Sequence, residues 1–395
     1  MQELDQILVL NNSCEVGTIA RTRDGLYAFE YTDEWVQEGF SISPLSLPLE
    51  KKVFMPRYEP LEGMFGVFFD SLPDGWGRLL VDRVLSSRGE NPHSLDHLAR
   101  LAIIGSSGAG ALCYKPTYQP GQPLTTDYDL DQIAEECERL LTVDSSSDLD
   151  ALFILGGSAG GARPKILTNI NGDDWIIKFP ATADPINIGE QEYAYALAAK
   201  NCGIAMTDVA LFESNRCPGY FGTKRFDRIT VDKDKTHTVS AQTTQIPMQL
   251  NQHKIHMVSA AALLETTHRV PNLDYIQLMK LTQILTDSMS ELQKLYKLMC
   301  FNVYAHNRDD HSKNFSFLYN EEAGDWHLSP AYDLTYSSSY YGQHATTVAG
   351  NGQDPELKDI MEVARQAGLS IRWARVTAAE IEENVSHLKQ YWVAR

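Results

Sequence analysis

Three oxygen-bearing side chains in the C-terminal third of the chain have the types and the spacing that phosphoryl transfer requires. Asp309 and Asn314 stand five residues apart, and Asp333 follows nineteen residues later. In-line transfer from ATP needs an acceptor for the proton of the attacking hydroxyl and hard oxygen ligands for Mg²⁺. The order of the residues predicts that Asp309 is the catalytic base and that Asn314 and Asp333 bind the metal.

A plainer interpretation of the same residues stays open at this point. The segment from Arg308 to Lys313 is rich in charge, and short motifs in acidic surface loops give false positives. Apolar runs at residues 315–318 and 326–328 predict two short strands. Such strands would hold the base and the metal ligands on a rigid, hairpin-like support.

Further upstream, three features follow one another in the order of the ATP-binding lobe of a kinase. They are a glycine-rich segment at residues 155–167, Lys178 within an apolar run, and Glu192 in a helix predicted over residues 190–199. Glycines let backbone amides approach phosphate closely, Lys178 would contact the α- and β-phosphates, and Glu192 would orient Lys178 through an ion pair. Residues 222–229 predict a strand and a connection whose backbone would meet adenine.

Each of these features also has an ordinary structural explanation. Glycine-rich segments are usually turns, a lysine among apolar residues can extend to solvent from a strand edge, and Glu192 can be a solvated helix position. What favours the kinase interpretation is that all of them occur in the right order.

Composition limits the class of protein. The chain has 395 residues, 43% of them hydrophobic and 22% charged, which is ordinary for a globular protein of two or three domains. The formal net charge of −18 opposes unaided binding to nucleic acid. We find no run of the roughly 18 to 20 apolar residues that a membrane-spanning helix needs and no secretion signal, so we expect a cytoplasmic protein without membrane contact. Six scattered cysteines lack zinc spacing and suggest reduced thiols.

The pattern of apolar residues also predicts how the chain is organised. A hairpin is expected over residues 17–31, turning at Asp24-Gly25, and a helix over residues 75–88. The proline-rich residues 116–123 read as a linker. The chain after about residue 236 is predicted to be mainly helical, with helices over residues 273–286, 289–305, 355–367 and 376–392.

Taken together, these motifs resemble those of the HipA-like serine/threonine kinases of bacterial toxin–antitoxin systems, over nearly the whole chain. The matching segments are Phe29-Glu30-Tyr31 with Trp35, and residues 42–49, 68–75, 160–165, 176–180, 192–193, 225–228, 309–315 and 332–333.

The resemblance implies an α+β, two-lobed kinase-like fold. Residues 1–118 would form a small β-rich N-terminal subdomain, residues 119–235 a mixed α/β nucleotide-binding lobe, and residues 236–395 an all-helical C-terminal lobe. It also implies an ATP- and Mg²⁺-dependent protein kinase that acts as a toxin. Its partner would be a HipB-like helix-turn-helix antitoxin, which would supply most of the contact with DNA. Its substrate would be a translation-related protein such as an aminoacyl-tRNA synthetase.

The resemblance also implies roles for individual residues of this chain. Asp309 would be the base, Asn314 and Asp333 the magnesium ligands, His311 part of the nucleotide site, and the backbones of Lys224 and Phe226 the adenine contacts. The nucleotide-binding set implied by the resemblance is Gly157, Ser158, Gly160, Gly161, Ala162, Lys165, Lys178, Lys224, Phe226 and His311.

Ser158 stands where the family has a serine that the kinase phosphorylates on itself. Phosphate there would add charge and bulk to the phosphate-binding loop and eject it, which would stop activity. The alternative is a small residue in a glycine turn.

Two departures from related patterns stand out. The second metal segment reads Ala331-Tyr332-Asp333-Leu334 and not Asp-Phe-Gly, so switching of the eukaryotic kind need not apply. Lys224 stands where better-known relatives have an acidic residue, which a backbone contact tolerates.

Two other functions remain open from the sequence. One is a small-molecule phosphotransferase, because Asp309-x-His311-x-x-Asn314 also resembles the catalytic loop of aminoglycoside and choline kinases. The other is an antitoxin-binding transcriptional co-repressor with weak kinase activity.

Overall fold

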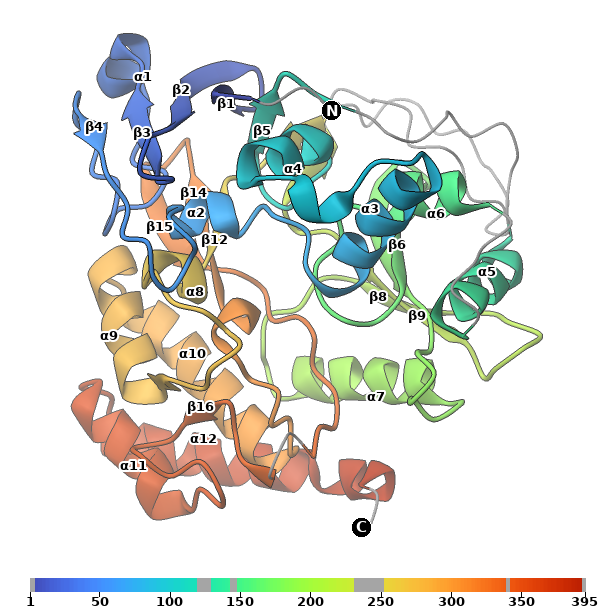
Figure 1. Ribbon diagram of the computed structural model, residues 1–395. Coiled ribbons are helices and arrows are strands. Elements are labelled where there is room, and N and C mark those ends of the chain that lie inside the picture. The colour runs from blue at the N-terminus through green and yellow to red at the C-terminus, as the bar shows by residue number, and fades with distance from the viewer. Residues whose placement is uncertain (1–3, 119–128, 143–147, 231–251, 339–341, 393–395) are drawn as a thin grey trace. The chain divides into compact units, whose positions relative to one another are not determined.

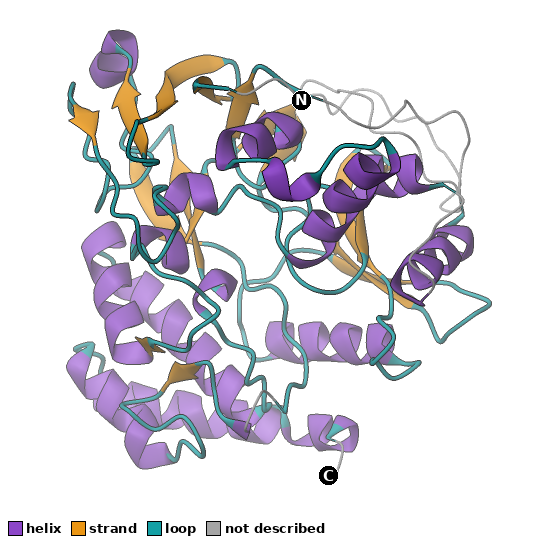
Figure 2. Cartoon of the chain, in the orientation of Figure 1, coloured by secondary structure: helices purple, strands orange, loops and turns teal. Residues whose placement is uncertain are grey.

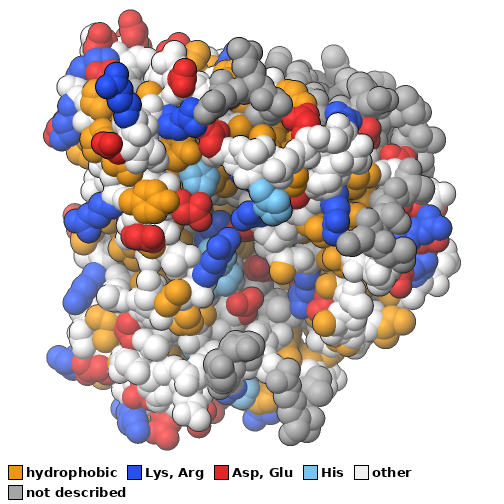
Figure 3. All heavy atoms as spheres, viewed as in Figure 1, with side chains coloured by type: hydrophobic (Ala, Val, Ile, Leu, Met, Phe, Trp, Pro, Cys, Tyr) orange, Lys and Arg blue, Asp and Glu red, His pale blue; other side chains and the backbone are white. Residues whose placement is uncertain are grey.

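The structure is a computed structural model that describes residues 4–118, 129–142, 148–230, 252–338 and 342–392 (Figures 1 and 2). The chain forms two compact units. Unit 1 comprises residues 1–190 and 209–257, and unit 2 comprises residues 191–208 and 258–395. Acidic and basic side chains are interspersed over the surface that Figure 3 shows. Among the described residues, no helix is long and apolar enough to cross a membrane.

The N-terminal part of unit 1 is an antiparallel sheet with the strand order β4-β3-β2-β1-β5. Its strands are β1 (Gln6–Asn11), β2 (Cys14–Arg21), β3 (Tyr27–Tyr31), β4 (Val53–Phe54) and β5 (Leu112–Lys115). The predicted hairpin is confirmed as β2–β3, and Gly25 in its turn has a φ of 79°, which glycine adopts without strain. Short helices accompany the sheet: α1 (Asp33–Glu38), α2 (Gly66–Phe69) and α4 (His97–Ile104).

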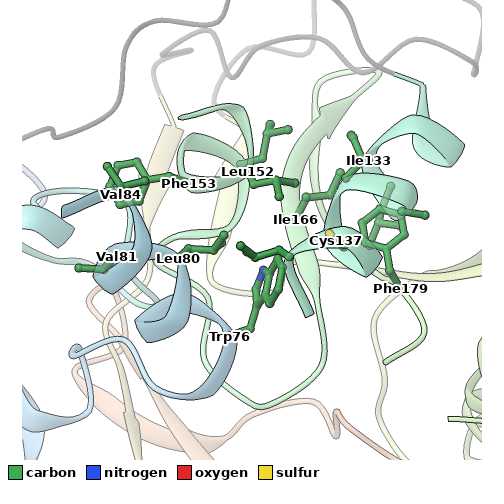
Figure 4. Packing of buried hydrophobic residues seen from close by; sticks show 14 of the residues in the cluster. Trp76, Leu80, Val81, Val84, Ile133, Cys137, Leu152, Phe153, Ile166 and Phe179 are labelled. Carbon is green, nitrogen blue, oxygen red and sulfur yellow. The ribbon is translucent and has the colours of Figure 1, made fainter. Parts of the chain in front are cut away.

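The second sheet of unit 1 has the antiparallel order β6-β7-β9-β8. It consists of β6 (Lys165–Ile170), β7 (Asp173–Lys178), β8 (Val209–Phe212) and β9 (Tyr220–Lys224). Three helices build its core: α3 (Gly75–Ser87), α5 (Leu130–Thr142) and α6 (Leu149–Gly156). Figure 4 shows how Trp76 and Leu80 of α3 and Leu152 of α6 surround Ile166 of β6. The helix predicted over residues 75–88 is thus confirmed as α3.

A buried ion cluster lies just after β9 in unit 1. The carboxylate of Asp227 accepts hydrogen bonds from both Arg225 and Arg228 and from the backbone N–H of Gly110. Although burial opposes ionisation, the two guanidinium groups hold the pKa of Asp227 well below its usual range. The short pair β10 (Arg228–Thr230) and β11 (Gln252–Lys254) follows.

Unit 2 is mainly helical. Its helices are α8 (Ala260–Leu263), α9 (Tyr275–Thr286), α10 (Met289–Tyr304), α11 (Leu357–Gln366) and α12 (Ile371–Asn384), followed by a 3₁₀ segment at Ser386–Tyr391. Asp274 begins α9 with a capping box that includes Gln277. Helix α7 (Ile188–Asn201) starts in unit 1 and contributes most of its length to unit 2.

The expectation of an all-helical C-terminal lobe holds for the large elements of unit 2 but not for its small ones. The structure contains the sheet β12-β14-β15, made of β12 (Met257–Ser259), β14 (Ser316–Asn320) and β15 (Asp325–Leu328), and the parallel pair β13 (Leu273–Asp274) and β16 (Thr346–Thr347). Strands of two to five residues carry too few side chains to show a clear alternation. The strands predicted at residues 315–318 and 326–328 are confirmed as the hairpin β14–β15.

The predicted division at residues 118 and 235 stays a prediction. Most of the linker at residues 116–123, and the boundary at residue 235, lie outside the described residues.

Candidate active site

The glycine-rich loop of unit 1 connects α6 to β6. Helix α6 ends at Gly156, and Gly157 caps it with an N–H that donates to the carbonyl of Phe153. Gly160, Gly161 and Ala162 are exposed, and Gly161 has a φ of 82°, a conformation that suits glycine. The loop therefore presents backbone groups to solvent, as phosphate binding would require.

The start of α3 holds this loop in place. The carboxylate of Asp74 accepts the N–H of Gly161 at 2.5 Å, and the N–H of Trp76 donates to the carbonyl of Gly161 at 2.8 Å. The indole of Trp76 donates to the carbonyl of Lys165 at 3.1 Å. A Cβ on Gly77 would lie 2.3 Å from the carbonyl oxygen of Ala159, so only glycine fits there without displacing the loop.

Sequence reasoning did not connect Asp74–Gly77 with the nucleotide loop. The segment lies some eighty residues upstream, where the sequence predicts a helix over residues 75–88 and resembles an N-terminal motif of the family at residues 68–75. One signal was available: two glycines flank Trp76 at the start of a helix, where alanine would be the better helix former.

Two lysines next to the loop occupy paired strand positions. Lys165 of β6 lies directly opposite Lys178 of β7, so the two side chains share one face of the sheet. They are only 9% and 8% exposed, and the ammonium group of Lys178 lies 5.6 Å from the ring centroid of Phe221. Both lysines therefore lie on one face of the sheet, beside the glycine-rich loop.

The adenine-contact residues lie further along the same sheet. Lys224 pairs with Trp175 on β7, and its ammonium group forms an ion pair with Asp173 at 2.8 Å. The adenine contact through the backbone of Lys224 stays a prediction. Phe226 follows just after the end of β9.

Ser158 is the half-buried residue of the glycine-rich loop that was singled out for regulation. Its hydroxyl donates to the carbonyl of Ser107 at 3.0 Å. A phosphate on that oxygen would have to give up this hydrogen bond, because the phosphorylated oxygen no longer has a proton to donate.

In unit 2, the catalytic loop follows α10. Asp309 is exposed, and the amide nitrogen of Asn314 donates to the carbonyl of Asp309 at 2.7 Å. This bond fixes the orientation of the Asn314 side chain. Its amide oxygen has no hydrogen-bond partner within the described part of the chain and is available as a ligand.

Asp310, the neighbour of Asp309, anchors the loop. Its carboxylate accepts the hydroxyl of Tyr275 at 2.9 Å, interacts with Nδ1 of His344 at 3.0 Å and accepts the N–H of Thr346 at 3.2 Å. Asn302 of α10 supports this network by donating to the hydroxyl of Tyr275. No local pattern in the sequence indicates this anchoring role of Asp310, because its partners lie 34 to 36 residues away in either direction.

The second metal segment is tied to the same loop. The hydroxyl of Tyr332 lies 2.6 Å from both the carbonyl of Lys313, to which it donates, and the hydroxyl of Ser316. These contacts tie the side chain of Tyr332 to the backbone of Lys313, the residue before Asn314. Asp333 adopts a left-handed φ of 58°, which is uncommon for a non-glycine residue and typical of functional sites.

A carboxylate and a carboxamide oxygen fit Mg²⁺. This ion takes few protein ligands and completes its shell with water and substrate phosphates. The described residues include no cluster of three or more His, Cys, Asp or Glu side chains that could hold a metal, so a self-sufficient transition-metal site is not indicated there.

His311 lies between the base and the metal ligand in sequence. Its ring centroid is 5.2 Å from that of His268, and its Nδ1 is buried without a hydrogen-bond partner in the described structure. The place of His311 in a nucleotide site stays a prediction.

The predicted residues therefore fall into two sets. Unit 1 brings together the loop residues 157–162 with Lys165 and Lys178, and places Lys224 and Phe226 at the far end of β9. Unit 2 holds Asp309, His311 and Asn314 on one loop, and the hydroxyl of Tyr332, the neighbour of Asp333, donates to the carbonyl of Lys313 in that loop. Glu192 lies on α7 in unit 2 and is 2% exposed. The roles of these residues remain predictions.

The fold and the two residue sets define a kinase-like α+β protein. Comparison with known families matches residues 7–115 to the HipA N-terminal domain and residues 157–392 to the HipA-like C-terminal domain. The chain therefore belongs to the HipA-like family.

Two known proteins illustrate the relationship. Y4mE of Sinorhizobium fredii, named as a candidate kinase, is 24% identical over 350 residues, which cover 82% of this chain and 76% of that protein. In the solved complex of Shewanella oneidensis HipA and HipB with operator DNA, the matching chain superposes with a TM-score of 0.67 at 17% identity. The match covers 98% of this chain and 92% of the Shewanella chain, and it shows a shared fold.

Proposed function

We propose that this protein is an ATP- and Mg²⁺-dependent serine/threonine protein kinase of the HipA type. The observation that carries the proposal is the arrangement of Asp309 and Asn314. Asp309 is exposed, and the side-chain amide of Asn314 is oriented by its hydrogen bond to the Asp309 carbonyl. Asp310 anchors the loop that carries both residues. A base that accepts a substrate proton must be exposed, whereas its support must be rigid.

The chemistry follows from the residue roles. The carboxylate of Asp309 accepts the proton of a serine or threonine hydroxyl as that oxygen bonds to the γ-phosphorus of ATP, and the bond from phosphorus to the β–γ bridging oxygen breaks. Asn314 and Asp333 would hold Mg²⁺, which neutralises negative charge on the phosphate oxygens when bound. Lys165, Lys178 and the amides of the glycine-rich loop neutralise the remaining phosphate charge.

Asp309→Asn tests the assignment of the base. The substitution removes the proton acceptor, so phosphoryl transfer should fall by about 10² to 10⁴-fold. Because Asp309 is exposed, the melting temperature should not change. Asp325→Asn, at an exposed aspartate of β15, is the matched control and should keep full activity. Activity that survives Asp309→Asn would contradict the assignment.

The acceptor class needs a separate experiment. Incubation of the chain with labelled ATP and a cell extract should label a protein band, and a translation factor such as an aminoacyl-tRNA synthetase is the expected substrate. Label that appears only in small molecules would favour a phosphotransferase of the aminoglycoside or choline kinase type instead.

We also propose a HipB-like helix-turn-helix antitoxin as the partner, in the cytoplasm, with DNA reached mainly through it. Support comes from the Shewanella HipA–HipB–DNA complex and from the net charge of −18, which disfavours direct phosphate contacts. The co-repressor alternative would gain if wild-type protein bound such an antitoxin and transferred no phosphate.

Autophosphorylation of Ser158 would regulate this kinase. Two features of Ser158 support this role. Its hydroxyl donates a hydrogen bond to the carbonyl of Ser107 that phosphorylation would remove, and it lies in the proposed phosphate-binding loop. Mass spectrometry after incubation with MgATP should find phosphate on Ser158. Ser158→Asp should lower activity about ten-fold or more because it adds charge beside the phosphate site, whereas Ser158→Ala should stay active and unmodified. A fully active Ser158→Asp variant would contradict the regulatory role.

A further inference from the structure

A cavity lies within unit 2. It has a volume of 210 Å³ and is built from the loop after α10, the segment before α11, the end of α12 and the 3₁₀ segment that follows. Six of its lining residues carry the argument: His306, Arg308, Asp354, Glu382, Lys389 and Trp392. None of the six belongs to the proposed kinase machinery, although Arg308 directly precedes Asp309.

The cavity brings together charges of both signs that are not paired with each other. Arg308 and Lys389 supply positive charge, and Asp354 and Glu382 supply negative charge. Within the described residues, none of these four side chains has a hydrogen-bond or ion-pair partner. The Nε of Arg308 is buried without a hydrogen-bond partner in the described structure, which costs free energy unless a ligand or water accepts a hydrogen bond from its N–H.

An aromatic wall completes the cavity. The imidazole of His306 stacks on the indole of Trp392, with ring centroids 3.8 Å apart and an angle of 16° between the planes. Burial, and then the positive charge of Arg308, lower the pKa of His306 to about 4, so the stacked imidazole is neutral at pH 7. The wall is thus flat and uncharged, and the ammonium group of Lys389 lies over the Trp392 ring, 5.7 Å from its centroid.

We propose that this cavity binds a small zwitterion with the chemistry of a free α-amino acid. The ligand carboxylate would bond to Arg308 and Lys389, the ammonium group to Asp354 and Glu382, and the side chain would lie against Trp392. A simple anion would meet the two carboxylates, and a simple cation would meet Arg308 and Lys389, so only a ligand with both charges satisfies all four groups. The volume is below the roughly 300 to 1,000 Å³ of sites for drug-sized ligands, which limits the ligand to a small molecule.

The test measures binding to the full chain and does not depend on kinase activity. Free α-amino acids are screened by ligand-observed NMR, and hits are titrated by calorimetry. At least one should bind with a Kd near or below about 1 mM. Its N-acetyl derivative and its methyl ester, which keep only one charge each, should bind about ten-fold more weakly.

Variants locate the binding site. Lys389→Gln and Asp354→Asn each remove one partner at the exposed rim and should weaken binding about ten-fold without changing the melting temperature. Glu383→Gln, next to Glu382 in sequence and outside the lining, is the matched control and should bind as wild type does. The proposal is overturned if no amino acid binds at about 10 mM, if the single-charge derivatives bind as tightly as the zwitterion, or if Lys389→Gln and Asp354→Asn bind like the control.

Discussion

Asp309 and Asp310 are neighbours in the sequence with opposite environments in the structure. Asp309 is exposed, whereas the carboxylate of Asp310 is buried among Tyr275, His344 and Thr346. The spacing to Asn314 already predicted that Asp309 is the reactive residue of the pair. The supporting role of Asp310 depends on donors from distant segments, which no local pattern reveals.

Asp310→Asn should destabilise unit 2, in contrast to Asp309→Asn. The carboxylate offers acceptors to three donors, and an amide group would turn an NH₂ toward at least one of them. We expect the free energy of unfolding to fall by about 1 to 3 kcal/mol or more, because a buried donor loses its acceptor. Urea denaturation of both variants measures the difference, and equal stability of the two would contradict the anchoring role.

At the scale of elements, the beginning of α3 positions the glycine-rich loop. Asp74 and Trp76 hold Gly161 by hydrogen bonds, and Gly77 lets Ala159 approach the helix. The sequence predicted α3 and the loop as separate features. It could not predict that one supports the other, because the close approach of Ala159 to Gly77 joins segments that lie far apart in the sequence.

Gly77→Ala tests this support. In a helix, alanine is normally favoured over glycine by up to about 1 kcal/mol. Here the added Cβ would lie 2.3 Å from the carbonyl oxygen of Ala159, so the backbone of the loop must shift. We expect lower stability and an ATP affinity reduced about ten-fold, since misplaced amides lose charged hydrogen bonds to phosphate. Isothermal titration with ATP measures the affinity.

Ser86→Ala, at an exposed position near the other end of α3, is the control for helix propensity. It should leave ATP affinity unchanged. If Gly77→Ala stabilises the protein and binds ATP normally, the close approach is not required.

At the scale of the whole molecule, the chain does not divide at a single point. Residues 191–208 belong to unit 2 although residues 209–257 return to unit 1. Changes in composition and linker-like segments mark boundaries between consecutive stretches of sequence. They therefore cannot fully describe units that are each built from two separate stretches. The family matches cover both halves of the chain and agree that one protein carries both residue sets.

Stability should decrease in mild acid because of buried neutral histidines. Burial lowers the pKa of His256 to about 4, and Nε2 of its ring lies 2.9 Å from the carbonyl oxygen of Ile42. In the unfolded chain a histidine titrates near about 6.5. The unfolded state therefore binds the proton first as pH falls, and stability that is fully present above about pH 6.5 is lost toward pH 4.

His256→Gln keeps a donor in reach of Ile42 and removes the titration. The loss of unfolding free energy between pH 6 and pH 5 should become smaller than in wild type by up to about 1.4 kcal/mol per pH unit. Urea denaturation at several pH values gives this slope. His253→Gln, at an exposed histidine of the same unit, should retain the wild-type slope. An unchanged slope in His256→Gln would show that this histidine does not cause the acid sensitivity.

The sequence by itself predicted several helices and strands and the order of the residues proposed for catalysis and binding. Apolar spacing gave α3, α9, α10 and the β14–β15 hairpin, because the period of a helix or strand is a local property. The order from the glycine-rich segment to Asp333 indicated a kinase-like protein. Only the tertiary structure decided which residues support that site: Asp74 for Gly161, 87 residues away, and His344 for Asp310, 34 residues away. Such pairs arise from packing between segments that no local period connects, so they become visible only when the chain is folded.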